Sequence, residues 1–96
     1  MDAAHDHGVL HTIRRLWEEG RVRFWDHAEE RMEERGIDVL DVQQVILHGR
    51  ISEHRKTRHA SRWKLTGKAV DGKLLAVVVE IQGDLLVIAV MRTRRG

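Results

Sequence analysis

The residues best suited to chemistry near the middle of this sequence are a histidine and two arginines. At 100° per residue, the inward stripe of a short helix contains Phe24, Ala28 and Met32. His27, Arg31 and Arg35 fall on or beside this same stripe, whereas long charged side chains are usually kept out of an interface unless they are paired or functional. Histidine transfers protons near neutral pH and arginine grips phosphate through a bidentate fork. We therefore expect catalytic roles for His27 and Arg31. The alternative is that they hydrogen-bond the helix to a sheet, and for Arg35 we favour a structural role at the helix end.

A dense basic segment lies between residues 50 and 68. It contains seven Lys and Arg residues and two histidines, and Glu53 is its one acidic residue. Such a patch is typical of a protein that binds a polyanion, and the alternative is a solvated basic loop that aids solubility. Within it we assign nucleic-acid binding to His54, Arg55, Lys56, Arg58 and Arg62.

Length and composition set the class of protein. Ninety-six residues suffice for a single domain, residues 1–96, with a modest core. The net charge of +2 conceals a balance of −5 over residues 1–48 and +7 over residues 49–96. There are no cysteines for disulfides or thiolate metal sites, the N-terminus lacks a signal-peptide pattern, and the longest apolar runs are too short to span a bilayer. We expect a cytoplasmic protein with no membrane contact.

Periodicity predicts helices first and a sheet afterwards. The expected helices are Val9–Trp17 closed by Gly20, a second that Asp26 caps and Gly36 ends, and a third that runs from the cap Asp38 to about His48. The third helix is apolar nearly all round and should be largely buried. The expected strands are Trp63–Val70, Lys73–Ile81 and Leu85–Thr93. Residues 21–24 form a short extended link, and residues 50–62 either form a mobile loop or contain an edge strand at Arg50–Glu53. The fold class is therefore α+β, with N-terminal helices packed on one face of a C-terminal antiparallel β-meander.

Turn lengths predict which side chains share a face of this sheet. Two-residue turns at Asp71-Gly72 and Gly83-Asp84 pair Lys64 with Val79 and Leu75 with Arg92. One face then carries Lys64, Thr66, Lys68 and Arg92 around a floor of Leu75, Val77, Val79, Ile88 and Val90. The helix-facing side carries Trp63, Leu65, Ala69, Leu74, Ala76, Val78, Val87, Ala89 and Met91. A row of bases over an apolar floor predicts a phosphate-binding cleft, and we assign catalytic roles there to Lys64, Lys68 and Arg92.

The stretch HAxxRMxxRGI, residues 27–37, begins a pattern that continues with an Asp38 cap, a helix closed by glycine and a β-meander. Over about residues 10–93 this pattern resembles a bacterial domain family allied with the RelE/MqsR-type toxins of toxin–antitoxin modules. The resemblance implies helices on one face of an antiparallel sheet and RNA cleavage at the other, basic face. It also implies a small metal-independent endoribonuclease that a cognate antitoxin protein inhibits.

The resemblance carries over unevenly to single residues. Lys56, Lys64 and Arg92 fall roughly where polar catalytic residues of such toxins are expected. The strand position at which that pattern has tyrosine corresponds to Leu75, and this sequence contains no tyrosine. Either histidine or lysine therefore transfers the proton here, or the domain keeps the fold without the activity.

Cofactor and metal sites are not expected. His5, His7 and His11 cluster near Asp6, yet there is no HExxH helix and no matching distant pair of ligands. We interpret these histidines as incidental. The three tryptophans are interpreted as core or interface residues rather than as base-stacking platforms.

Three hypotheses for function remain open. The first is a type II toxin that cleaves RNA by attack of the 2′-hydroxyl, with RNA and a cognate antitoxin as partners. The second is a non-catalytic RNA-binding module of the same fold, and the third is an interaction protein whose basic patch pairs with an acidic partner. If the strand Leu85–Met91 lies at an edge, strand addition by a partner or by a second copy, giving a homodimer, is also plausible.

Overall fold

The chain folds as an α+β protein in the computed structural model, which describes residues 3–93 and the side chains of residues 7–93. The helices are α1 (Ala3–Glu18), α2 (Asp26–Arg35) and α3 (Val39–His48). The strands are β1 (Val22–Phe24), β2 (Arg50–Lys56), β3 (Ser61–Lys68), β4 (Leu74–Gln82) and β5 (Asp84–Arg92). The predicted fold class is confirmed.

The five strands form one mixed sheet in the order β1-β5-β4-β3-β2. Strands β2 to β5 are antiparallel to their neighbours, as a meander requires, and β1 runs parallel to β5. The expected link at residues 21–24 thus supplies a fifth strand, and the basic segment forms β2 and a hairpin rather than a loop. Strand β5 lies between β1 and β4 and is therefore not an edge strand. Strand addition at Leu85–Met91 by a partner or a second copy required an edge, so that condition is not met.

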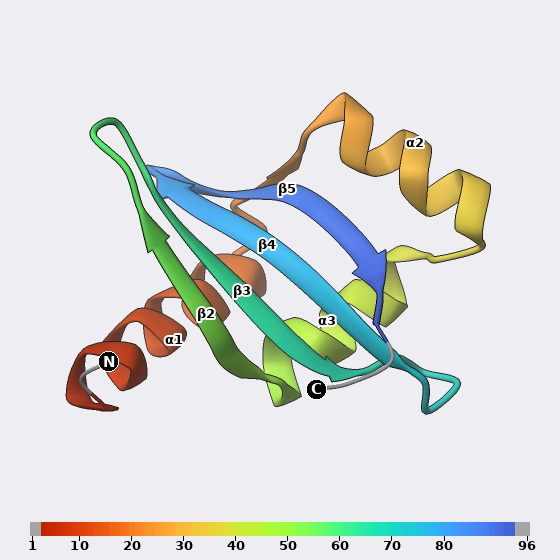
Figure 1. Cartoon of the computed structure of the whole chain (residues 1–96), viewed down its shortest axis with the longest axis horizontal. Helices are drawn as coiled ribbons and strands as arrows, with labels where there is room; N and C mark the ends of the chain where they lie inside the picture. The colour runs from red at the N-terminus through yellow and green to blue at the C-terminus, as the bar shows by residue number, and fades with distance from the viewer. Residues whose placement is uncertain (1–2, 94–96) are drawn as a thin grey trace.

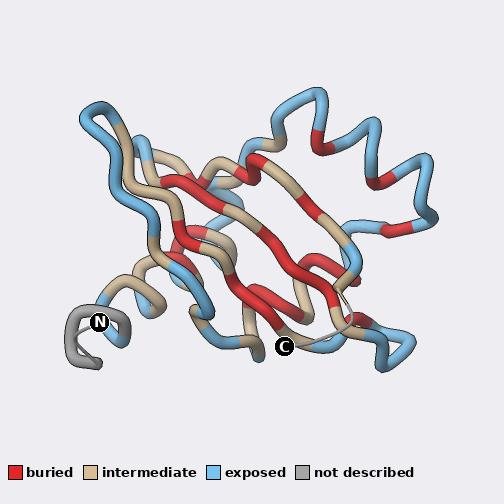
Figure 2. Tube along the Cα trace, viewed as in Figure 1, coloured by how far each residue is buried: buried red, intermediate tan, exposed pale blue. Residues whose placement is uncertain are grey.

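Two helices cover one face of the sheet and leave the other face open (Figure 1). Helices α1 and α3 lie behind the strands in this view, whereas α2 lies beside β5. The helices contribute Ile13, Leu16, Val42, Val45 and Ile46 to the core, and the strands contribute Leu65, Leu75, Val77, Val79 and Val87. Figure 2 shows the buried positions along the central strands and on the inner sides of the helices. In the described part of the chain, no helix has both the length and the apolar character needed to cross a membrane.

Helix α3 begins where the sequence predicts, because Asp38 and Asp41 form a capping box. The Asp41 N–H donates to Oδ1 of Asp38 at 3.1 Å, and the Asp38 N–H donates to Oδ2 of Asp41 at 3.0 Å. The Oδ1 atom of Asp41 also accepts the N–H of Val70 at 3.1 Å, which ties the helix to the β3–β4 hairpin. The first turn is less buried than expected. Val39 and Leu40 are exposed, since Val42, Val45 and Ile46 form the buried side of the helix.

Helix α2 ends as predicted at Gly36, whose φ of 65° lies in the left-handed region that glycine adopts readily. Its predicted cap is wrong. Asp26 lies within the helix, and Trp25 takes the N-cap position without a side-chain hydrogen bond. The Trp25 N–H donates to the carbonyl of Val87 at 3.0 Å, so pairing with β5 continues through Trp25 and the helix begins after it.

The last turn of α3 is held by α1 and packed closely on the sheet. Arg14, inside the predicted first helix, donates from Nε to the Ile46 carbonyl at 2.9 Å and from Nη2 to the Gly49 carbonyl at 2.8 Å. These bonds satisfy carbonyls that the end of the helix leaves without helical partners. A Cβ at Gly67 would lie 2.9 Å from the Cα of Gly49, so this contact needs glycine.

The β3–β4 register differs by one residue from the predicted one. Lys68 pairs with Leu74 and Lys64 with Val78, where we expected Leu75 and Val79. The cause is the turn. The Ala69 N–H donates to the Lys73 carbonyl, which makes a three-residue loop whose last residue, Gly72, has a φ of 84°.

This shift moves the side chains of β4 to the opposite face from the predicted one. The expected cleft floor of Leu75, Val77 and Val79 is the buried core beneath the helices. The open face instead carries Leu74, Ala76 and Val78 from β4. The β3 assignment is confirmed, because Trp63, Leu65 and Ala69 are buried on the helix side.

Strand β5 follows the predicted register only in its second half. Leu75 pairs with Arg92 and Val77 with Val90, as expected, so both Val90 and Arg92 lie on the helix side rather than beside Lys64. A bulge opposite Val78 and Val79 shifts the register nearer the turn. Ala89 and Met91, which we expected on the helix side, lie on the open face because they pair with Val78 and Ala76 of β4.

Candidate nucleic-acid interface

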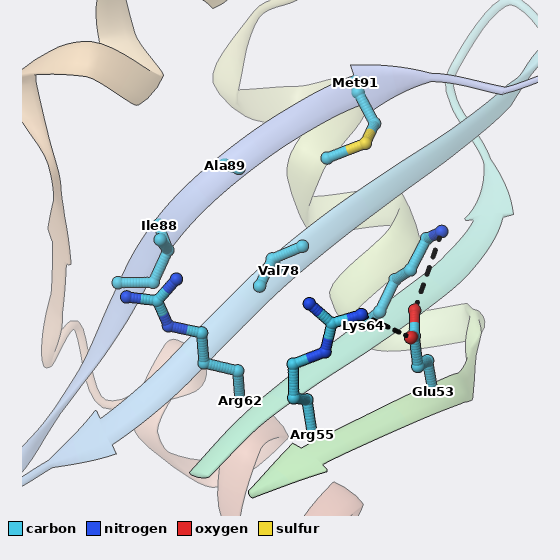
Figure 3. A pocket seen from close by; sticks show the side chains of 8 residues that line it. All are labelled: Glu53, Arg55, Arg62, Lys64, Val78, Ile88, Ala89 and Met91. Atoms are coloured by element: carbon cyan, nitrogen blue, oxygen red, sulfur yellow. Dashed lines mark hydrogen bonds and ion pairs between the residues drawn. The ribbon is translucent and has the colours of Figure 1, made fainter. Parts of the chain in front are cut away.

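The open face of the sheet contains a shallow hollow of ≈ 390 Å³ (Figure 3). Its lining comes from four adjacent strands and consists of Glu53, Arg55, Arg62, Lys64, Val78, Ile88, Ala89 and Met91. We name its three basic residues, Arg55, Arg62 and Lys64, the open-face cluster. Figure 3 shows these side chains rising from β2 and β3 beside the apolar side chains of β4 and β5. The hollow thus combines positive charge with an apolar floor, as predicted, although most of the floor residues are different ones.

Strand alternation explains how the open-face cluster forms. Lys64 pairs with Glu53, and Arg62 pairs with Arg55, so all four side chains leave the sheet on one side. A bulge in β2 between Ile51 and Glu53 sets this register. The β5 bulge adds Ile88 to the floor beside Ala89.

Glu53 holds two members of the open-face cluster by loose ion pairs. Its Oε1 lies 3.4 Å from Nη2 of Arg55, and its Oε2 lies 4.0 Å from Nζ of Lys64. All three side chains are at least one-third exposed. Ion pairs of this kind contribute about 0–1 kcal/mol. A phosphate group can therefore replace Glu53 as the partner of Arg55 and Lys64 at little cost in stability.

Arg62 is held more firmly than the other two cations. Its Nε donates to Oε1 of Glu80 at 2.7 Å, and Oε2 of Glu80 accepts Nε2 of Gln82 at 2.6 Å. The Glu80 side chain is only 4% exposed. A buried carboxylate needs such partners, because desolvation of an unpaired charge is costly. Our sequence analysis missed Glu80 and did not assign Glu53. The available signal for Glu80 was a single acid inside the apolar run of β4.

The basic residues of α2 border the same surface. A second hollow is lined by His27, Ala28, Arg31 and Arg35 from α2 and by Ala89, Val90 and Met91 from β5. It shares Ala89 and Met91 with the first hollow, so the two adjoin.

The predicted inward stripe of this helix is confirmed for its apolar residues but not for its basic ones. Ala28 and Met32 are buried against the sheet, while His27, Arg31 and Arg35 remain exposed at the rim. Among the described residues, no hydrogen bond or ion pair involves these three side chains, so the alternative in which they bond the helix to the sheet finds no support.

The structure therefore brings together five of the ten predicted site residues. His27, Arg31, Arg55, Arg62 and Lys64 border the two adjoining hollows.

The other five lie elsewhere. Arg92 is on the helix side, where its Nη1 lies 3.6 Å from Oδ2 of Asp71, because the register places it opposite Leu75. Lys68 lines a separate hollow near His48. His54 and Lys56 alternate with Arg55 and so take the helix side of β2, and Arg58 lies in the β2–β3 turn.

His54 has a packing role instead. Its ring stacks on Trp63 with centroids 4.8 Å apart and planes 6° from parallel. The partner, Trp63, is a buried core residue.

Metal ligands do not gather in the described part of the chain, where no group of three or more His, Cys, Asp or Glu residues is placed to hold an ion. The side chains of His5 and Asp6, part of the N-terminal histidine cluster, lie outside the described residues.

A protein-family model described as "Domain of unknown function (DUF4258)" matches residues 24–92. This span contains every residue of the two adjoining hollows. No curated protein and no solved structure matches the chain.

Proposed function

The chain belongs to the DUF4258 family, and we propose that its open face binds RNA and cleaves it without a metal ion. In this proposal the 2′-hydroxyl attacks the adjacent phosphorus, and the bond from phosphorus to the 5′-oxygen breaks. The products are a 2′,3′-cyclic phosphate and a free 5′-hydroxyl.

The observation that carries the proposal is the open-face cluster. Three cations from two neighbouring strands stand above an apolar floor, and only loose pairs with Glu53 restrain two of them. Exposed Arg and Lys side chains bind phosphate groups by charge-assisted hydrogen bonds. The apolar floor beside them offers a surface on which nucleosides can pack. Arg31 and Arg35 extend the positive charge along the adjoining rim.

Glu53 and Lys64 are the proposed acid–base pair, since Oε2 of Glu53 lies 4.0 Å from Nζ of Lys64 and both can reach one phosphodiester. Glu53 would take the proton of the 2′-hydroxyl, and the Lys64 ammonium, in the same hollow, would give a proton to the leaving 5′-oxygen. Arg55 and Arg62 would stabilise the charge that develops on the phosphate oxygens. These roles need no tyrosine, and the sequence contains none.

A second candidate function is RNA binding without cleavage. It is favoured by the position of His27, the histidine that the sequence predicts to be catalytic, because β3, β4 and β5 lie between His27 on α2 and Glu53 on β2. The resemblance to RelE/MqsR-type toxins favours the catalytic proposal, and with it a cytoplasmic protein that pairs with a cognate antitoxin.

Incubation with a mixed RNA substrate in EDTA tests the two candidates. The wild type should cleave, Glu53→Gln should cleave about 10²–10⁴-fold more slowly while still binding RNA, and Lys64→Ala should lose both binding and cleavage. Arg92→Ala is the matched control, since Arg92 is a basic strand residue on the other face, and it should behave as the wild type. If the wild type binds RNA but does not cleave it, the catalytic proposal is wrong and RNA binding without cleavage remains. Equal cleavage by all four proteins would move the site away from the open face.

A further inference from the structure

One tryptophan is placed differently from the other two. Trp25, at the junction of β1 and α2, is 42% exposed. Trp17 is part-buried, and its Nε1 donates to Oε1 of Gln43 at 3.1 Å, whereas Trp63 is buried beneath His54. Of these three rings, the indole of Trp25 is the one that offers a large surface to a ligand.

Trp25 adjoins the open-face cluster through Arg62. The Cζ atom of Arg62 lies 5.5 Å from the centroid of the Trp25 ring, in a cation–π arrangement. The backbone also fixes the tryptophan, because its N–H donates to the Val87 carbonyl. The indole and the cluster therefore form one continuous surface.

Arg62 can bind a phosphate group while its guanidinium stays over the Trp25 ring. Its bond to the buried Glu80 uses Nε, and the two Nη groups have no hydrogen-bond partner within residues 7–93, so they can donate to a ligand. Gln82 holds the other oxygen of Glu80, which limits movement of the guanidinium over the ring. A phosphate on the Nη groups would thus lie next to an exposed aromatic ring.

We propose that Trp25 is a stacking platform for an unpaired nucleobase, and that the ligand of this face is single-stranded RNA. The proposal rests on RNA binding by the open-face cluster. Every base has a π face, and stacking on an exposed aromatic ring beside a phosphate-binding groove is the main sequence-independent way to hold a single strand. In a duplex the bases are already stacked on one another, so a double strand could use the cations and gain nothing from the indole.

The test compares two oligonucleotide probes of equal length, an oligouridine and the same oligomer with abasic residues. Both carry the same phosphates, and only the first has bases. Trp25→Ala should weaken binding of oligouridine about 5- to 100-fold and leave binding of the abasic oligomer unchanged. Trp25→Phe, which keeps a smaller ring, should fall between the wild type and Trp25→Ala.

Tryptophan fluorescence gives a second readout that does not depend on affinity. Oligouridine should quench the emission of the wild type and of Trp17→Phe, and the quench should be lost in Trp25→Phe. Trp17→Phe is the matched control because Trp17 is the same residue type away from the open face, packed edge-on against Phe24.

The outcomes separate this inference from the function on which it rests. If Trp25→Ala binds oligouridine as the wild type does while Arg55→Ala weakens both probes, the stacking role is wrong and RNA binding stands. Equal weakening of both probes by Trp25→Ala would also overturn the stacking role, since the abasic oligomer has no base to stack. If the wild type binds neither probe, both proposals are wrong.

Discussion

The Nε of Arg62 lies 2.7 Å from Oε1 of Glu80, in an ion pair whose acid is buried and whose base is 42% exposed. The acid lies on the open face of the sheet, in a strand whose other residues are apolar except Gln82 at its end. This pair joins stability to the proposed function, because the residue that neutralises Glu80 is also a member of the open-face cluster.

Removal of Arg62 should destabilise the protein more than removal of both partners. Arg62→Ala leaves a buried carboxylate without its cation and should lower the free energy of unfolding by about 1–3 kcal/mol, at the low end of buried pairs because Arg62 is partly exposed. An Arg62→Ala/Glu80→Leu double variant should recover part of this loss, since an apolar side chain then fills the buried site. Urea denaturation of the two variants measures the difference. A double variant less stable than Arg62→Ala would contradict this account.

Asp41 should matter more than its neighbour in the capping box. Asp41→Ala removes the acceptor for Asp38 N–H and the acceptor for Val70 N–H, so it should lower the free energy of unfolding by about 2 kcal/mol. Asp38→Ala removes only the cap and should lower it by about 1 kcal/mol. Thermal unfolding followed by circular dichroism compares the two. Equal losses would mean that the Val70 bond contributes nothing.

A methyl group at Gly67 should not fit. The Cβ of Gly67→Ala would lie 2.9 Å from the Cα of Gly49, and a backbone atom cannot move away as the end of a side chain can. The variant should therefore lose about 1–3 kcal/mol of stability. Gly8→Ala is the matched control. Gly8 lies within α1 with open space around it, so this variant should gain up to about 1 kcal/mol from helix propensity. Unfolding curves of the two variants that shift in the same direction would contradict the packing argument.

Local signals in the sequence predict the helix ends well. Gly36 has the backbone conformation that ends a helix, and Asp38 forms the expected cap, because both depend on residues within one turn. Long-range effects limit the rest. Trp25 takes the place of Asp26 as the N-cap because it pairs with β5, more than sixty residues away in the sequence. The parallel strand β1 has only three residues and leaves no pattern of its own.

The candidate site was predicted in part, for a physical reason that lies in one turn. Alternation along β3 placed Lys64 on the correct face without any knowledge of the partner strand. The Asp71-Gly72 pair fits both a two-residue turn and the end of a three-residue loop, and only the second occurs. That difference of one residue exchanged the faces of β4. Arg92 was misplaced for the same reason, because Leu75, its correctly predicted partner, moved with β4 to the helix side.

The salt dependence of RNA affinity tests the central claim most directly. The affinity of oligouridine should be measured between low and physiological salt for the wild type, Lys64→Ala and Arg92→Ala. If Lys64 contacts a phosphate on the open face, its loss should weaken binding at every salt concentration and reduce the slope of log K against log salt by about 0.7, while Arg92→Ala keeps both affinity and slope. An unchanged slope in Lys64→Ala, or an equal change in Arg92→Ala, would contradict the assignment of the open face as the RNA-binding surface.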